Sequence, residues 1–163
     1  RQYGVVLGTT VLLLDGLKGA LAAWVCLLLF PAQSWVMVAS GFAVVAGHNW
    51  PIFFRFSGGG GLTTVDGYLL VIKPLDTLLF TIFTFLMALL FAKVPALGRA
   101  VRPLGRPLPA AAVFGLILYI IYSLIWYGFL WFTLLLLVFG IEMVIRRSRV
   151  VKIEDKARKE DDV

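Results

Sequence analysis

The sequence predicts an all-α fold, a polytopic transmembrane bundle with about six crossings, and two observations lead to this prediction. The first is composition: 61% of the 163 residues are apolar, 15% are charged and the mean hydropathy is +0.95. Soluble domains are about half apolar and a quarter charged. The second is the recurrence of long apolar runs separated by short polar or basic connections. Lipid is therefore the expected solvent for most of the chain.

The apolar runs define the expected helices in chain order. A bilayer core needs about 20 helical residues, so some runs span it comfortably and two are short. The runs are Gly4–Phe30, Trp35–Ala46, Leu62–Ile72, Leu75–Ala92, Leu108–Trp126 and Phe129–Ile145.

Basic residues set the expected orientation. Lys and Arg gather in the connection 93–107 and in the tail 146–163, and basic residues near span ends favour the cytoplasm. With both segments inside, the uncharged Pro31–Ser34 and Tyr127-Gly128 become external turns. Lys73-Pro74 becomes a third, because proline is tolerated at the head of the returning helix. Of the fifteen basic residues, all but Lys18 and Lys73 then lie inside.

The chain divides into a membrane domain, residues 1–145, and a cytoplasmic tail, residues 146–163. The tail mixes both charges and has no interleaved aromatic residues, so no nucleic-acid partner is expected. Cys26 is the single cysteine and offers neither a disulfide nor a metal site. No Met begins the chain and Arg1 nearly adjoins an apolar run, so we expect the numbering to start inside a larger protein. The sequence sets no oligomeric state.

An ionisable pair lies in the middle of the first run. Asp15 and Lys18 are three residues apart and therefore share a helix face. Charged groups at that depth are costly and usually face a bundle interior or a wet cavity. Two interpretations stay open: the pair neutralises itself and holds helices together, or Lys18 points at an anion.

The only histidine and four consecutive glycines form a polar segment between the second and third runs. Pro51 bars helix continuation, so the second helix should end near His48. Glycines let backbone N–H groups converge, and a helix starting near Leu62 adds its positive N-terminal end. Gly58–Gly61 is thus either an anion cradle or a flexible hinge, and His48 is either catalytic or an interfacial hydrogen-bonding residue.

This polar segment also carries a family resemblance. GHNWPIFFRFSGGGGLTT, residues 47–64, resembles the second motif of the bacterial acyl-phosphate:glycerol-3-phosphate acyltransferases, which reads G-H-N-[FW]-P-[VI]-F-x-x-F-K-G-G-K-G-x-x-T. LLLDGLKGALAAW, residues 12–24, resembles their Leu-rich D-x-x-K-G-A segment. The likeness in sequence is concentrated over Leu12–Thr64, while the hydrophobic layout is similar along the whole chain.

The resemblance implies an enzyme of phospholipid biosynthesis in the bacterial inner membrane, with seven spans and its catalytic loops facing the cytoplasm. Such enzymes transfer a fatty acyl group from acyl phosphate to the 1-hydroxyl of glycerol 3-phosphate, giving lysophosphatidic acid, among membrane lipids and with no metal or cofactor. Carried over residue by residue, the implied catalytic pair is His48 and Asn49. The implied phosphate-binding residues are Lys18, Gly58, Gly59 and Gly61.

The chain departs from the family pattern at several positions. Gly60 stands where the family keeps a lysine, and Ser57 where it keeps another basic residue. The first motif, Ser-Gly-Asn, would lie before Arg1. The third motif, R-H-R-E-N-I, corresponds to IRRSRVVKI and loses its His, Glu and Asn at Arg147, Arg149 and Val150.

Each lost charge-assisted contact is worth about 1.5–3 kcal/mol, so a degenerate, non-catalytic member is one alternative to the enzyme. A small anion- or lipid-binding membrane protein or a transporter is another. Turnover of acyl phosphate separates these classes.

The predicted topology has a direct test. A cysteine introduced at Gly128 should react with an impermeant reagent added outside the cell, whereas one at Gly105 should not, because the basic connection around Gly105 is expected inside. The reverse labelling pattern would rule out the six-crossing arrangement.

Overall fold

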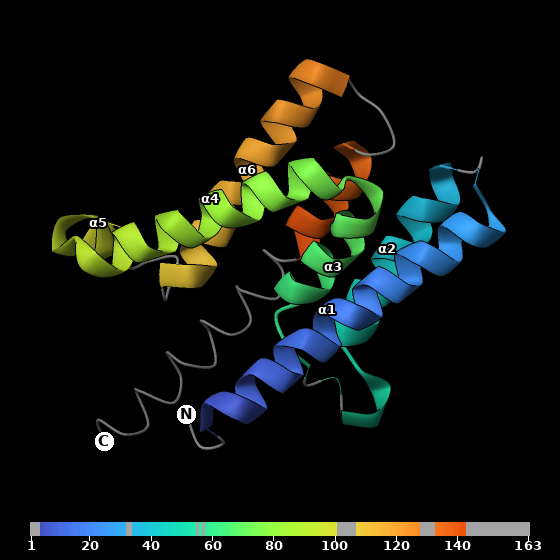
Figure 1. Ribbon diagram of the computed structural model, residues 1–163, viewed down its shortest axis with the longest axis horizontal. Coiled ribbons are helices and arrows are strands. Elements are labelled where there is room, and N and C mark those ends of the chain that lie inside the picture. The colour runs from blue at the N-terminus through green and yellow to red at the C-terminus, as the bar shows by residue number, and fades with distance from the viewer. Residues whose placement is uncertain are drawn as a thin grey trace.

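The computed structural model describes residues 4–31, 34–54, 56, 58–100, 107–127 and 133–142, and every regular element in these residues is a helix (Figure 1). The all-α prediction is confirmed. The elements are α1 (Gly4–Leu29), α2 (Ser34–Asn49), the short 3-10 helix η1 (Ile52–Phe54), α3 (Leu62–Ile72), α4 (Pro74–Lys93), α5 (Pro95–Ala100), α6 (Pro107–Tyr127) and a last helix, Thr133–Glu142.

Proline and glycine explain the helix boundaries nearest the polar segment. Pro51 follows the end of α2 at Asn49, within a residue of the predicted end. Gly61, in the left-handed region at φ 75°, immediately precedes α3. At the far end of α3 the Lys73 N–H donates to the Leu69 carbonyl, and Pro74 begins α4. The predicted break between helices at Lys73-Pro74 is thus confirmed, while its external position stays a prediction. The short helix α5, inside the basic connection, was not predicted.

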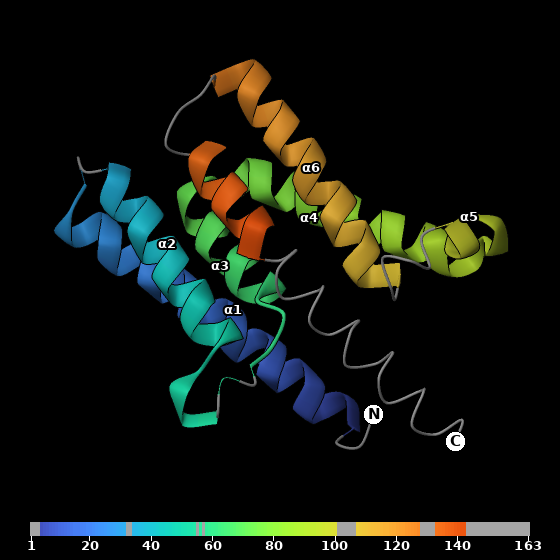
Figure 2. The same cartoon turned by 180° about the vertical axis from the view of Figure 1, so that it is seen from behind.

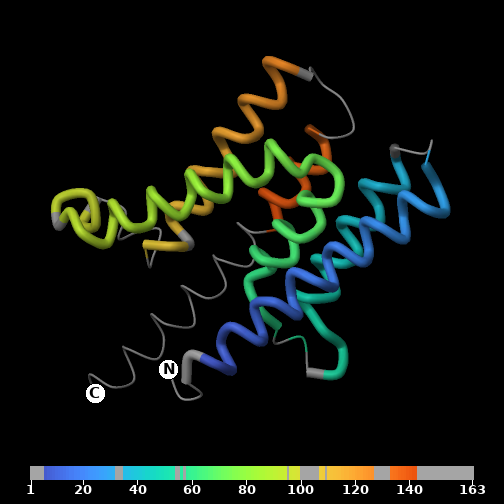
Figure 3. The backbone as a smooth tube through the Cα atoms, viewed as in Figure 1, coloured from blue at the N-terminus to red at the C-terminus, as the bar shows by residue number. Residues whose placement is uncertain are grey.

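The long helices form two pairs, and the shorter helix α3 lies between them. α1 and α2 run side by side in opposite directions, and α4 packs along α6 (Figures 1 and 2). α3 contacts α1 on one side and α4 on the other, as the tube in Figure 3 shows. The helix Thr133–Glu142 lies over α3 in the view of Figure 2. α3 therefore links the two pairs.

The core is centred on Tyr68 of α3, which is fully buried. Its hydroxyl donates to the Met37 carbonyl of α2 at 2.6 Å and lies 2.6 Å from the Ser40 hydroxyl. Its ring meets Phe139 edge to face, with centroids 5.9 Å apart. Leu135 packs in the same cluster. One aromatic residue thus joins α2, α3 and the last helix.

α1 and α3 approach each other backbone to backbone. A Cβ placed on Gly67 would overlap the Gly16 carbonyl oxygen and lie 2.9 Å from the Gly16 Cα. One placed on Gly19 would overlap the Thr64 carbonyl oxygen and lie 3.0 Å from the Tyr68 nitrogen. Small residues at such crossings let membrane helices pack closely. Glycine is therefore required on both helices at this crossing.

The outward faces of the helices suit a lipid solvent, since large apolar side chains such as Leu13, Leu79 and Ile125 are well exposed. Each of the six predicted spans overlaps a helix in the described residues, the last one over Thr133–Glu142. By length and composition, two helices in the described residues qualify as spans: Val6–Leu29 and Pro74–Lys93. The count of about six crossings therefore stays a prediction.

The α1–α3 crossing generates a stability prediction. Gly67→Ala should lower the free energy of unfolding by about 1–3 kcal/mol, because its methyl group meets rigid backbone and this outweighs the gain of about 1 kcal/mol in helix propensity. Gly16→Ala is the matched control, since its Cβ would lie 3.7 Å from the Thr63 carbonyl oxygen, an ordinary contact. Thermal melting in detergent compares the two. Equal melting temperatures would show that the crossing is looser than described.

Candidate functional site

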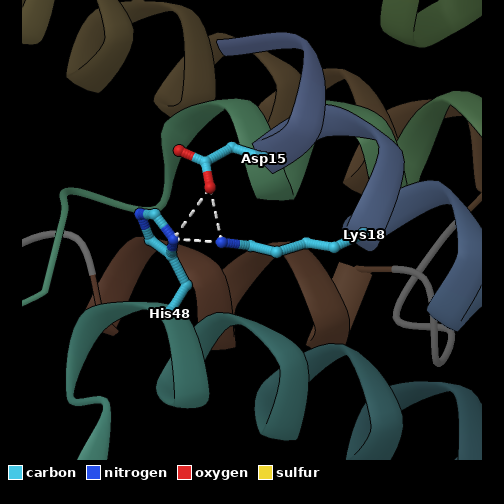
Figure 4. A network of polar contacts seen from close by, with 3 residues as sticks. All are labelled: Asp15, Lys18 and His48. Atoms are coloured by element: carbon cyan, nitrogen blue, oxygen red, sulfur yellow. Dashed lines mark hydrogen bonds and ion pairs between the residues drawn. The ribbon is translucent and has the colours of Figure 1, made fainter. Parts of the chain in front are cut away.

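An ionic cluster joins the middle of α1 to the end of α2 (Figure 4). The Lys18 Nζ donates to the Asp15 Oδ1 at 2.6 Å, and it also contacts the His48 Nδ1. The His48 Nδ1 lies 3.4 Å from the same Asp15 oxygen. Three groups that can carry charge therefore meet at one point between two helices.

The two helices present these side chains for separate reasons. On α1, the three-residue spacing places Asp15 and Lys18 on one face, as predicted. On α2, His48 lies in the last turn before the break at Pro51. The side chains of Asp15 and His48 are 20% and 12% exposed, whereas that of Lys18 is 39% exposed. The lysine is thus the member of the cluster most open to its surroundings.

The glycine loop folds back onto the end of α2. A Cβ on Gly58 would lie 2.6 Å from the Pro51 Cδ and 2.7 Å from the Asn49 carbonyl oxygen. One on Gly59 would overlap the His48 Nε2 and lie 2.8 Å from its Cε1. Both positions therefore have no space for a side chain.

The other two loop glycines differ from each other. Gly61 combines φ 75° with a built Cβ only 2.7 Å from the Asn49 Oδ1, so both conformation and space favour glycine there. A Cβ on Gly60 meets nothing within 4 Å, and the residue is exposed. Gly59 does not share the left-handed φ of Gly61, and it is restricted by the imidazole packed against it rather than by its φ.

The loop leads directly into the N-terminus of α3. Gly61 is the N-cap residue and, having no side chain, makes no side-chain hydrogen bond to the first turn. The first N–H groups of a helix have no partners within the helix, and with the helix dipole they favour an anion. The start of α3 is therefore a suitable place for a phosphate.

Asn49 lies against the loop, next to Gly58 and Gly61. Its side chain is fully buried, and neither its Oδ1 nor its Nδ2 has a hydrogen-bond partner within the described part of the chain. An unsatisfied buried amide costs about 1–3 kcal/mol. The unpaired amide next to the loop makes Asn49 a candidate member of the site.

The structure brings every predicted site residue into one connected group. Lys18 contacts His48, the His48 ring lies against Gly59, and Asn49 lies between Gly58 and Gly61. Sequence pattern alone does not show that Asp15 lies close to His48. The only signal available was that both are polar residues in apolar surroundings, which cannot show that two helices place them together.

Two further observations concern metal binding and the positions at which the chain departs from the family pattern. No three His, Cys, Asp or Glu side chains among the residues with described positions could jointly hold a metal ion. The family departures at Ser57, Arg147, Arg149 and Val150 lie outside the described residues, whereas Gly60 is described and faces open space.

The geometry defines a class: a helical membrane protein with a glycine-rich loop beside a partly buried ionic cluster. The sequence profile of the glycerol-3-phosphate acyltransferase family matches residues 1–152. The chain belongs to this family.

Individual relatives and solved structures agree with this assignment. The glycerol-3-phosphate acyltransferase of Halalkalibacterium halodurans is 37% identical over 135 residues, covering 76% of this chain and 66% of that protein. That of Myxococcus xanthus is 45% identical over 74 residues, covering 45% of this chain and 38% of that protein. The chain thus spans less than two thirds of the length of these relatives.

The fold is similar to that of PlsY (YgiH), an integral membrane glycerol 3-phosphate acyltransferase. Its glycerol 3-phosphate form superposes with a TM-score of 0.72 at 26% identity, covering 97% of this chain and 72% of that one. Its lysophosphatidic acid form gives a TM-score of 0.70, covering 95% and 72%. The all-helical fold of the described residues is therefore similar to that of an integral membrane protein.

The loop packing generates a second prediction. With glycerol 3-phosphate as the proposed ligand, Gly59→Ala should reduce its affinity by about ten- to hundredfold, because its methyl group displaces the His48 ring and small displacements in a site are costly. Gly60→Ala is the control and should stay within about twofold of the parent, as an exposed change in open space. Isothermal titration of each folded variant measures the affinity. Equal affinities would reduce the loop to a hinge.

Proposed function

We propose that the protein transfers a fatty acyl group from acyl phosphate to the 1-hydroxyl of glycerol 3-phosphate, forming lysophosphatidic acid and inorganic phosphate. The observation that carries this proposal is the meeting of Lys18, His48 and the Gly58–Gly61 loop at the start of α3. The names of the relatives and the glycerol 3-phosphate form of PlsY support the acceptor substrate.

The site is suited to holding phosphate. Loop and helix N–H groups supply neutral donors, and Lys18 supplies a cation that is partly exposed. Hydrogen bonds to ionised groups are stronger than neutral ones. In this proposal Lys18, Gly58, Gly59 and Gly61 bind substrate phosphate, while His48 and Asn49 orient the reacting groups.

The reaction needs little beyond such binding. Acyl phosphate is a mixed anhydride, so its carbonyl carbon is already activated. The acceptor hydroxyl oxygen forms a bond to that carbon, the bond from the carbon to the phosphate oxygen breaks, and the hydroxyl proton passes to the departing phosphate. Inorganic phosphate leaves with the electron pair. Holding both substrates together and stabilising the developing oxyanion account for the acceleration.

Acyl phosphate and lysophosphatidic acid are amphiphilic, which fits a polar site in a helical bundle with apolar outer faces. We place the protein in the bacterial cytoplasmic membrane with the glycine loop facing the cytoplasm, since glycerol 3-phosphate is a water-soluble cytoplasmic metabolite. The excess of basic residues on the same predicted side supports that orientation.

The open space at Gly60 favours a second candidate, a family member that binds its substrates without turning them over. A lysine is kept there in the family that the sequence resembles, and this chain has no side chain to replace it. The two candidates share the phosphate-binding step and differ only in the acyl transfer.

Both candidates are tested by the full-length protein reconstituted in membranes with acyl phosphate and radiolabelled glycerol 3-phosphate. Labelled lysophosphatidic acid is the expected product. Gly60→Lys should lower the KM for glycerol 3-phosphate by about three- to tenfold, because it adds a cation at an exposed position where water screens part of its effect. Gly60→Gln controls for the added bulk.

The possible outcomes separate the candidates. Binding of glycerol 3-phosphate without product, in both the parent and Gly60→Lys, would support the non-catalytic member. Absence of binding to either would reject the phosphate site.

A further inference from the structure

The two ring nitrogens of His48 face different groups, and this asymmetry has a chemical consequence. The Nδ1 points towards α1, where it contacts the Lys18 Nζ and lies 3.4 Å from the Asp15 Oδ1 (Figure 4). The Nε2 lies on the side of the loop, where a Cβ on Gly59 would overlap it. The proton of a neutral imidazole can be on either nitrogen, and the partner of one nitrogen decides the state of the other.

Lys18 decides the state of the Nδ1. A lysine ammonium has three N–H donors and no acceptor, so the nitrogen that it contacts must accept. A proton on the Nδ1 would place two hydrogen-bond donors, the Nδ1–H and the Lys18 ammonium, against each other. An imidazolium would place two cations in contact. The Asp15 oxygen is a weaker competitor, because 3.4 Å is beyond the usual range of about 2.7–3.2 Å for an N–H···O bond.

We propose that Lys18 is a positioning residue that holds His48 as the neutral tautomer with its proton on the Nε2. His48 then presents an N–H donor to the glycine loop. That donor adds to the backbone N–H groups at the start of α3, so this side of the loop offers donors to an anion with several acceptor oxygens. The identity of that anion rests on the proposed function, whereas the tautomer does not.

The alternative arrangement would give His48 the opposite role. When a carboxylate alone pairs with the Nδ1, it accepts a hydrogen bond from the Nδ1–H and so leaves the Nε2 unprotonated, as a base, as the aspartate does in serine hydrolase triads. Asp15 is near enough to play that part if Lys18 is removed. The lysine therefore determines whether the imidazole is a donor or a base at the loop.

Since His48 is the only histidine, nitrogen NMR of protein labelled with ¹⁵N-histidine reports this one ring without assignment. The parent protein in detergent micelles near neutral pH should show a protonated Nε2 and an unprotonated Nδ1. Lys18→Met should move the proton to the Nδ1, which then donates to Asp15. Lys18→Arg should keep the parent tautomer, because a guanidinium also has donors only.

Lys73→Met is the matched control, because it removes a lysine at the far end of α3 and should leave the spectrum unchanged. A protonated Nδ1 in the parent protein would overturn the proposal, and so would an unchanged tautomer in a folded Lys18→Met. If Lys18→Met does not fold, the parent and Lys18→Arg spectra still decide the question.

Adding glycerol 3-phosphate tests the donor role directly. The Nε2 and its proton should shift as the ligand saturates, while the Nδ1 should stay unprotonated. Saturable binding detected by calorimetry without any change at the Nε2 would show that His48 does not donate to the ligand. Failure of acyl transfer, by contrast, would overturn the proposed reaction and leave the tautomer measurement standing.

Discussion

The close backbone contact between α1 and α3 is the constraint on which the other features depend. It exists because Gly67 lies against the backbone of Gly16 and because Gly19 faces the backbone of Thr64. In lipid there is little hydrophobic force between helices, so close packing of small residues supplies much of the attraction. A larger residue at Gly67 or Gly19 would separate the two backbones. The N-terminus of α3 would then move away from the charged residues of α1.

That contact explains why the site forms where it does. Asp15 and Lys18 flank Gly16 on α1, so the crossing brings them to the depth at which α3 begins. The loop before α3 must then return to the end of α2, where it packs against His48. A charged pair that would be costly in lipid is thus placed next to an imidazole and a polar loop. Structural neutralisation and anion binding, which the sequence left as alternatives, are compatible in this arrangement.

The loop combines positions that tolerate no side chain with one that does. Gly58 and Gly59 are held by contacts with α2, and Gly61 by its conformation as well, whereas Gly60 projects into open space. The family membership and the unfilled space at Gly60 are therefore consistent with each other. The glycine loop is present, while a cation of the resembled motif is absent at Gly60. In the proposed function, the charge of Lys18 consequently carries more weight in this chain.

The sequence by itself determined the helical class and the ends of α2 and α3, while the residues of the candidate site were proposed from the family resemblance. The class and the helix ends follow from local causes: an excess of apolar residues, the missing N–H of Pro51 and Pro74, and the freedom of the loop glycines. Only the tertiary structure decided that Lys18 and Asp15 meet His48, that Gly59 is restricted by a ring rather than by its φ, and that Gly60 is open. Those facts depend on how closely two helices approach. That distance is set by the fit of residues far apart in the chain, such as Gly16 against Gly67, which local sequence pattern cannot reveal.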